Sequence, residues 1–491
     1  MNTFMENLKE VNNYGLTENG AVKHLHTKSA VLDMFALCGA YRNRSVEDCI
    51  IMFKNALEEN ETLAVKCLFY LGDCRGGQGE RRFFRVCFKW LAKNYPEVAL
   101  RNLQAIPEYR RWDDVIYSTV ETPIEDAALA FIKHQLALDV ESKTPSLLAK
   151  WMPSENASSR ETKRVAGIVR AYLGMTHKQY RKTLSVLRER INIVERLMSE
   201  NRWDEIEFDK IPSKAGLIYR NAFARRDMIA KKYETFAKDK TTKVNAEVLN
   251  PVDIADKVFS CRYGKMGETE RAMLDKYWEN LKDYYNGREE NGLAIVDVSG
   301  SMWGQPLNAA VSMGAYIAER GHGPFANHFI TFSERPALVK FEGVDIYDKF
   351  RRAEKADWAM NTNIEAVFDM LLATAKREGT KAEDMPERLY IFSDMEFDRC
   401  VKNHTGNRMN SDGMNTLLEG IAQEWATASY ELPKVVFWNL DARSNNIPAL
   451  GGRFSYVSGF SMNMVETILS GKDGYDLMLE KLMSERYAMV G

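Results

Sequence analysis

The sequence predicts an α-helical repeat region followed by an α/β domain with a doubly wound sheet. From Ser29 to about Tyr285, apolar residues recur at three- and four-residue steps, which is the period of an amphipathic helix. Beyond this point, short apolar runs alternate with amphipathic stretches, which is typical of a mostly parallel sheet covered by helices. A polar stretch containing two glycines separates the two patterns. We therefore expect two domains, residues 1–287 and residues 288–491.

Short turns divide the helical region. Its clearest helical segments are Val46–Leu57, Leu63–Leu71, Arg82–Ala92 and Ile124–Leu138. Helices of roughly this length with brief turns favour antiparallel pairs stacked into a solenoid of the HEAT type. We find no repeat of fixed period that would support the solenoid independently. The longest predicted helix runs from Lys178 to Glu200, with its apolar residues on one face.

A basic block lies within the helical region. Between Arg160 and Lys240 there are 20 Lys or Arg against 11 Asp or Glu, although the whole chain has a formal net charge of −2. Such a block in an otherwise acidic protein indicates an anionic partner such as RNA. A solvated helix face with ion pairs is the alternative. The residues that we predict to bind RNA are Lys163, Arg164, Arg170, Lys178, Arg181, Lys182, Arg220, Arg225, Arg226, Lys231 and Lys232.

Aromatic residues are interleaved with these cations. Such rings can stack on unpaired bases, but a single ring is more often part of a hydrophobic core. The aromatic residues of the block, and the tryptophan just before it, are Trp151, Tyr172, Tyr180, Trp203, Tyr219, Phe223 and Tyr233.

The second half alternates strands with helices. The predicted strands are Leu293–Val298, His328–Phe332, Ala337–Phe341, Arg388–Phe392, Lys434–Asn439 and Ser455–Val457. The predicted helices are Pro306–Arg320, Asn363–Arg377, Met414–Tyr430, Asn463–Leu469 and Tyr475–Met483. Only a short turn joins the second strand to the third, so we expect the third strand to be an antiparallel edge strand.

The segment Gly292–Trp303 combines a buried strand with oxygen-bearing side chains. Its apolar run ends in Asp297, and Ser299 and Ser301 follow at alternate positions. Ligands of open α/β sheets bind at the carboxyl ends of the strands. Oxygen donors suit a hard divalent cation such as Mg2+. The alternative is a strand end whose Asp or Ser caps the next helix.

Two later segments bring further oxygen donors to the same edge. Asp394 follows the predicted strand Arg388–Phe392, and parallel strands share their carboxyl edge. Thr362 stands where a loop leads into the predicted helix Asn363–Arg377. The predicted metal ligands are Asp297, Ser299, Ser301, Thr362 and Asp394.

This half resembles a von Willebrand factor A domain, because those five residues match its metal-ion-dependent adhesion site one by one. The resemblance implies Mg2+ or Mn2+ held by Ser299, Ser301 and Thr362, with Asp297 and Asp394 acting directly or through water. It also implies that a carboxylate of an acidic protein partner fills the open coordination position. Asn361 departs from the family pattern, in which a glycine is frequent, and this leaves the conformation of the loop open.

The domain order resembles the Ro autoantigen (TROVE) architecture, in which a ring of helical repeats is closed by a von Willebrand factor A domain. A family of unknown function from plants and large viruses has the same order and more similar motifs. Those motifs in this sequence are Asp73–Glu80, Pro107–Asp114 and Leu148–Pro153. The Ro resemblance implies RNA binding, and the basic block points to the same class of partner.

Other features restrict the class of protein. Seven dispersed cysteines without a Cys-x-x-Cys pair predict reduced thiols in a cytoplasmic protein, rather than disulfides or a zinc site. The sequence has no signal-peptide pattern and no apolar run of the ~18 residues that a membrane span needs, so we expect no membrane partner. P-loop, His-Glu-x-x-His and Gly-x-Ser-x-Gly motifs are absent, and we predict that the chain is not an enzyme.

Three functions stay open at this point. In the first, a basic helical ring holds single-stranded or structured RNA, and the metal-binding domain closes the ring or recruits a partner. In the second, the protein is a metal-dependent scaffold for protein–protein interaction and binds no RNA. The third and least favoured is a metal-dependent phosphoesterase, because such an enzyme needs a base beside the metal and the sequence nominates none.

Overall fold

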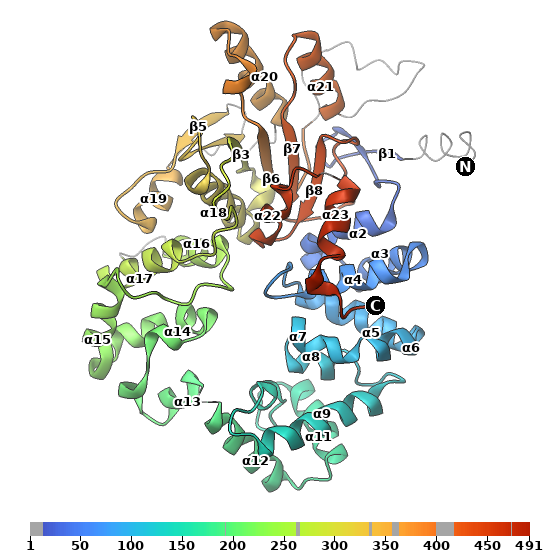
Figure 1. Cartoon of the computed structure of the whole chain (residues 1–491), viewed down its shortest axis with the longest axis vertical. Coiled ribbons are helices and arrows are strands. Elements are labelled where there is room, and N and C mark those ends of the chain that lie inside the picture. The colour runs from blue at the N-terminus through green and yellow to red at the C-terminus, as the bar shows by residue number, and fades with distance from the viewer. Residues whose placement is uncertain are drawn as a thin grey trace.

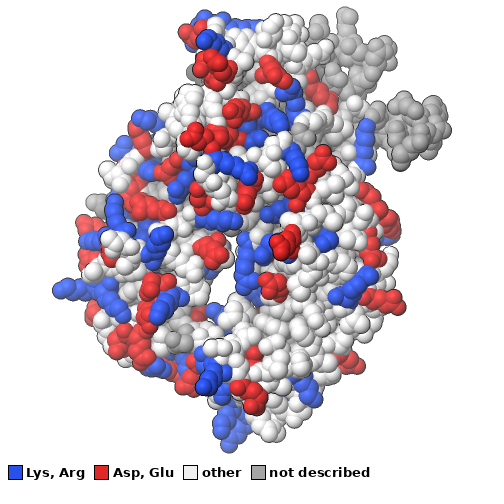
Figure 2. Space-filling view, viewed as in Figure 1, with Lys and Arg blue, Asp and Glu red and all other residues white. Residues whose placement is uncertain are grey.

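The computed structural model describes residues 13–191, 193–261, 266–332, 336–355, 363–398, 417–472 and 474–491. It has a mostly helical N-terminal region and a C-terminal mixed sheet of six strands. Figure 1 shows two helical arms that leave the sheet and come together at the opposite end of the molecule. Figure 2 shows a narrow opening between the arms. The described part of the chain contains no helix that is both long and apolar enough to cross a membrane.

The N-terminal region is built from helices that range from one turn to nearly five turns. On the first arm these are α2 (Ala30–Leu37), α3 (Val46–Glu59), α4 (Glu61–Gly72), α5 (Arg81–Asn94), α6 (Pro96–Arg101), α7 (Ile106–Tyr109) and α8 (Trp112–Tyr117). The far end contains α9 (Glu125–Glu141), α10 (Leu148–Trp151), α11 (Arg160–Tyr172), α12 (His177–Arg190) and α13 (Val194–Ser199). The second arm contains α14 (Ser213–Arg225), α15 (Asp227–Lys238), α16 (Pro251–Ser260) and α17 (Glu268–Glu279).

Side-chain caps begin several of these helices. Ser45 and Thr176 each accept a hydrogen bond from the backbone three residues on and form a capping box, at the starts of α3 and α12. The Asn60 and Ser159 side chains cap α4 and α11, and each accepts a single hydrogen bond from a backbone N–H group. These polar residues thus set the helix boundaries that the apolar periodicity alone leaves undefined.

The predicted single helix from Lys178 to Glu200 is wrong, because the chain forms two helices there. Between α12 and α13, Ile193 is extended (φ −73°, ψ 140°). The sequence at the break is rich in β-branched residues, which favour extended backbone. Leu187 and Leu197 are nevertheless both buried, so the apolar stripe continues across the break and periodicity alone could not reveal it.

The six strands have the order β5–β4–β3–β6–β7–β8. They are β3 (Gly292–Asp297), β4 (His328–Phe332), β5 (Ala337–Lys340), β6 (Arg388–Ser393), β7 (Lys434–Asn439) and β8 (Phe454–Ser458). Every neighbouring pair is parallel except β4 and β5, which confirms the predicted antiparallel edge strand. Strands β3 and β6 are buried along their whole length, which fits the apolar runs Leu293–Val296 and Leu389–Phe392 at their centres.

Helices pack around the sheet. They are α18 (Gln305–Arg320), α19 (Ile346–Ala353), α20 (Ile364–Glu378), α21 (Leu417–Thr427), α22 (Val465–Ile468) and α23 (Gly474–Leu482). Helix α18 packs on β3, β4 and β6, and α23 packs on β8. The sequence did not predict α19, because its buried face consists of only Ile346, Phe350 and Ala353 among charged residues.

Both ends of the chain join the helical region to the sheet. The N-terminal hairpin of β1 (Tyr14–Leu16) and β2 (Val22–His24), which the sequence did not predict, is hydrogen-bonded to the loop after β6. Near the C-terminus, Arg486 forms an ion pair with the buried Asp73, which ends α4. On the other arm, α16 packs on α18 and α17 packs on α19. The division at residue 287 stays a prediction.

Candidate functional site

The predicted metal ligands of β3 and β6 lie together at the carboxyl edge of the sheet. Val296 and Phe392 are register partners, so Asp297 and Ser393 end two adjacent parallel strands. The Ser393 hydroxyl donates to Asp297 Oδ2 (2.5 Å), and the Ser299 amide donates to Asp297 Oδ1 (2.9 Å). Asp297 and Asp394 are 0% and 1% exposed. Two carboxylates are thus buried at one edge of the sheet.

The two serine hydroxyls face the same edge. Ser299 Oγ and Ser301 Oγ lie 3.0 Å apart, and Ser301 belongs to a short 3-10 turn, Gly300–Met302. Ser299 precedes this turn without capping it through its side chain, and α18 begins later, after Gly304. The helix-cap alternative is therefore not supported. Thr362, the remaining predicted ligand, lies outside the described residues.

The environment of this edge opposes the ionisation of Asp297. Burial raises the pKa of Asp297 well above its usual range, and the charge of Asp394 adds to this effect. The hydrogen bonds from Ser393 and Ser299 lower the pKa but do not outweigh the rise. The donors are carboxylate and hydroxyl oxygens, which Mg2+ and Mn2+ prefer. Among the described residues there is no group of three or more His, Cys, Asp or Glu side chains that could hold a metal. A site here would depend on the serine hydroxyls and on water.

Arg443 is a residue of this site that the sequence analysis missed. Its guanidinium donates to Asp394 Oδ2 (2.5 Å) and pairs with Glu18 Oε2 of the N-terminal hairpin (2.9 Å). Arg443 lies in the loop after β7, which is another parallel strand ending at the same edge. Its position beyond a strand's carboxyl end was the signal that could have identified it.

The basic block covers α11 to α15, and about half of its predicted RNA-binding residues have structural partners. Arg164, Arg170 and Arg220 form ion pairs with glutamates. Arg226 donates to Asn201, and Lys232 donates to the Asp204 and Ile206 carbonyls. Arg181 donates to the His177 carbonyl (3.3 Å) and stays exposed. The remaining predicted residues are exposed, and their side chains form no hydrogen bond or ion pair with described residues: Lys163, Lys178, Lys182, Arg225 and Lys231.

The aromatic residues of the block divide in a similar way. Tyr180, Trp203, Phe223 and Tyr233 are buried and belong to the hydrophobic core. The other three are half-buried and keep part of their rings at the surface: Trp151, Tyr172 and Tyr219. Most of the predicted stacking rings are therefore core residues.

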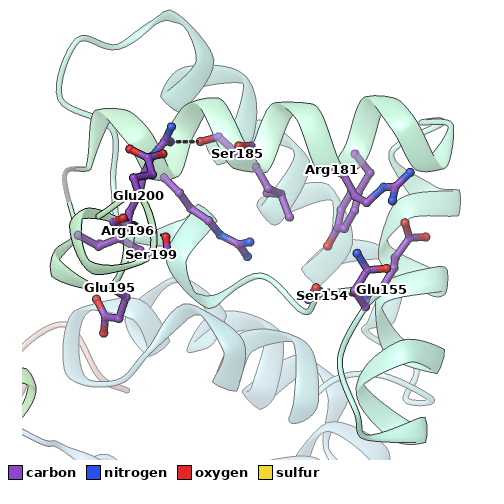
Figure 3. Close-up of a pocket in the computed structure, with 13 residues that line it drawn as sticks. Ser154, Glu155, Arg181, Ser185, Glu195, Arg196, Ser199 and Glu200 are labelled. Carbon is purple, nitrogen blue, oxygen red and sulfur yellow. Dashed lines mark hydrogen bonds and ion pairs between the residues drawn. The ribbon is translucent and has the colours of Figure 1, made fainter. Parts of the chain in front are cut away.

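A cavity of about 460 Å3 opens between α12, α13 and the turn at Ser154. Figure 3 shows Arg181 and Glu155 at one end and Arg196 and Glu200 at the other. Three arginines and three glutamates line the cavity, so their charges balance: Arg181, Arg188, Arg196, Glu155, Glu195 and Glu200. Its size suits a small molecule, but its charge does not favour an anion.

Comparison with known proteins connects both halves to families without an assigned function. Residues 17–116 and 146–287 match a domain of unknown function, DUF2828, and residues 291–487 match a second one, DUF7788. The uncharacterized protein L728 of Acanthamoeba polyphaga mimivirus is 29% identical over 505 residues, which cover 94% of this chain and 85% of that protein.

The fold as a whole is similar to that of a solved structure. The crystal structure of the Deinococcus radiodurans RO (RSR) protein matches with a TM-score of 0.50 and 13% sequence identity. The match covers 93% of this chain and 99% of that chain. The chain therefore has a Ro-like fold, with a helical region and an α/β domain, and at this identity the likeness concerns the fold alone.

Proposed function

We propose that this protein, built on a Ro-like fold, binds RNA through the basic surface of its helical region. In this proposal the helical region is a HEAT-like ring, and the α/β domain, of the von Willebrand factor A type, closes it. The observation that carries the proposal is the set of exposed cations on α11, α12, α14 and α15 whose side chains have no partner in the part of the chain that the structure describes. Cations that no protein carboxylate neutralises are available to phosphate groups.

The proposed role is binding rather than catalysis. The hydroxyls of Ser299 and Ser301 are hydrogen-bonded to each other beside two buried carboxylates. This arrangement suits a held cation, whereas hydrolysis at a metal needs a base that activates water. A ribonucleoprotein with a structural or partner-binding metal fits these features better than a phosphoesterase.

Salt dependence tests RNA binding directly. If Lys163, Lys178, Lys182, Arg225 and Lys231 contact phosphates, the logarithm of the affinity for a single strand falls with a slope of about −3.5 in log salt. Wild-type protein should then bind a fluorescein-labelled oligouridylate of roughly 20 nucleotides on the order of a hundredfold more weakly at about 200 mM than at about 50 mM salt. Fluorescence anisotropy measures this change, and the absence of binding at the lower salt concentration would end the proposal.

A second function, capture of an acidic protein partner through a metal, is favoured by the carboxyl edge of the sheet. There Asp297 and Asp394 are buried beside two serine hydroxyls, and bound Mg2+ or Mn2+ would supply an open coordination position. The residues that would hold the ion are Asp297, Ser299, Ser301, Thr362 and Asp394. This function uses a different part of the molecule from RNA binding, so both can operate together.

Asp394→Asn should weaken Mn2+ binding at least about tenfold, because one of the two buried carboxylates then loses its charge. Isothermal titration calorimetry and Mn2+ electron paramagnetic resonance report this binding without any assay of function. Asp384→Asn removes an exposed carboxylate of the same domain and should leave Mn2+ binding unchanged. Equal affinity in wild type and Asp394→Asn would exclude this edge as the metal site.

A further inference from the structure

A cluster of arginines outside the basic block joins α5 to α8. We call it the arginine cluster, and its members are Arg81, Arg85, Arg110, Arg111, Asp113 and Asp114. Arg81 and Arg85 lie in the first two turns of α5, Arg110 and Arg111 directly precede α8, and Asp113 and Asp114 lie in its first turn. Four guanidinium groups against two carboxylates leave a net charge of about +2.

The two carboxylates bind all four guanidinium groups. Asp113 Oδ2 accepts from Arg81, from Arg85 (3.0 Å) and from Arg111 (3.0 Å). Asp114 accepts from Arg81 Nε (3.3 Å), from Arg85 and, through its other oxygen, from Arg110 Nε (3.0 Å). The acids therefore hold the arginines in fixed positions without neutralising them completely.

Burial places the negative charges beneath the positive ones. The Asp114 and Arg110 side chains are 1% and 3% exposed, and Asp113 is 10% exposed. Arg81 and Arg111 are 41% and 31% exposed. The Arg81 and Arg111 side chains are therefore more accessible to an approaching ligand than the two carboxylates are.

Neighbouring rings hold two of the guanidinium planes in place. Arg111 lies over the Trp151 ring, 4.0 Å from its centre, and Arg85 lies over Tyr117 at 4.6 Å. Trp151 and Tyr117 are half-buried, so each arginine is fixed by stacking as well as by ion pairing. A site whose donors are held in advance loses less entropy when it binds an anion.

The positively charged guanidinium groups of the cluster repel one another. Partial burial lowers the pKa of Arg81, and the charges of Arg85 and Arg111 lower it further. Asp113 and Asp114 act in the opposite direction. Burial opposes ionisation of Asp114, but Arg110, Arg85 and Arg81 outweigh it and hold the pKa of that carboxyl below its usual range. A bound anion would relieve the repulsion among the arginines.

The cluster also lies where a strand held by the ring could reach it. In Figure 1, α7 and α8 are on the inner side of their arm, next to the space between the arms. Figure 2 shows Lys and Arg side chains beside the opening. From these observations we propose that the arginine cluster binds backbone phosphates of single-stranded RNA, as a second contact separate from the basic block. This inference rests on the proposed function of RNA binding.

The double variant Arg81→Gln/Arg111→Gln tests the inference. It brings the net charge of the cluster to about zero, while Arg85 and Arg110 still pair with Asp113 and Asp114. If two phosphate contacts are lost, the salt slope for the oligouridylate becomes shallower by about 1.4 and the affinity at about 150 mM salt falls roughly tenfold. The control Arg377→Gln/Lys381→Gln makes the same charge change at exposed ion pairs on the α/β domain and should bind like wild type.

The outcomes separate this inference from the proposed function. If wild type binds RNA and the double variant matches the control, the arginine cluster is only a structural ion-pair network, and RNA binding elsewhere stands. If wild type binds no RNA, both proposals fail. If thermal unfolding shows that the double variant is destabilised, the single variants Arg81→Gln and Arg111→Gln test the inference instead. Each should make the salt slope shallower by about 0.7.

Discussion

Replacing four exposed cations of the basic block by glutamine should weaken RNA binding on the order of a hundredfold at about 150 mM salt. The variant is Lys178→Gln/Lys182→Gln/Arg225→Gln/Lys231→Gln. These side chains have no partner among the described residues, so their removal breaks no ion pair of the fold. Each phosphate contact releases a counterion, and four lost contacts flatten the salt slope by about 2.8. Anisotropy titrations with the oligouridylate at several salt concentrations measure both effects.

A matched control separates local contacts from overall charge. Lys54→Gln/Arg101→Gln/Arg377→Gln/Lys381→Gln removes the same number of charges from exposed ion pairs outside the block. Its affinity and slope should stay close to wild type, since exposed pairs contribute little to stability and these lie away from the block. If the two quadruple variants lose affinity equally, long-range attraction accounts for binding, and the block is not the contact surface.

Asp73→Ala should destabilise the protein by about 3 kcal/mol, because it removes a buried charge that several groups bind. The Asp73 carboxylate is completely buried and accepts from Arg486 Nη2 (2.7 Å), the Tyr487 hydroxyl (3.0 Å) and the Arg75 amide (2.9 Å). Two of these donors come from the C-terminal end of the chain and one from the turn after α4. Asp73 thus attaches the end of the chain to the first helical arm, and urea unfolding measures the loss.

The control for this prediction is Asp476→Ala on α23, an exposed carboxylate that should change stability by less than about 0.5 kcal/mol. In a double-mutant cycle with Arg486→Ala, the coupling energy with Asp73 should exceed about 1 kcal/mol. Equal stability of the Asp73→Ala and Asp476→Ala variants would contradict the role of Asp73 in joining the two halves.

Apolar patterning predicted the α/β half better than the helical half. The six predicted strands agree with β3 to β8 to within a residue or two, because buried parallel strands need unbroken apolar runs. Asp297, Ser299 and Asp394 could be grouped correctly because parallel strands share one carboxyl edge. The helix break at Ile193 could not be predicted, since the apolar stripe continues on both sides of it.

The sequence could not show which charged residues form ion pairs. Composition revealed the excess of Lys and Arg in the basic block, but only the structure shows that Arg164, Arg170 and Arg220 are engaged by glutamates. The partners of Arg443, Asp394 and Glu18, are also remote in sequence, so only the structure shows that this cation is engaged. Counts of charge identify a basic region, whereas tertiary contacts decide which cations remain available.

Photocrosslinking of wild-type protein to 4-thiouridine-substituted RNA tests the central claim most directly, because mass spectrometry then identifies the peptides next to the strand. RNA binding by the helical ring predicts crosslinked peptides from α11–α15, within residues 160–238. Crosslinks confined to residues 292–491 of the α/β half, or no crosslinks from a protein shown to be folded, would contradict it.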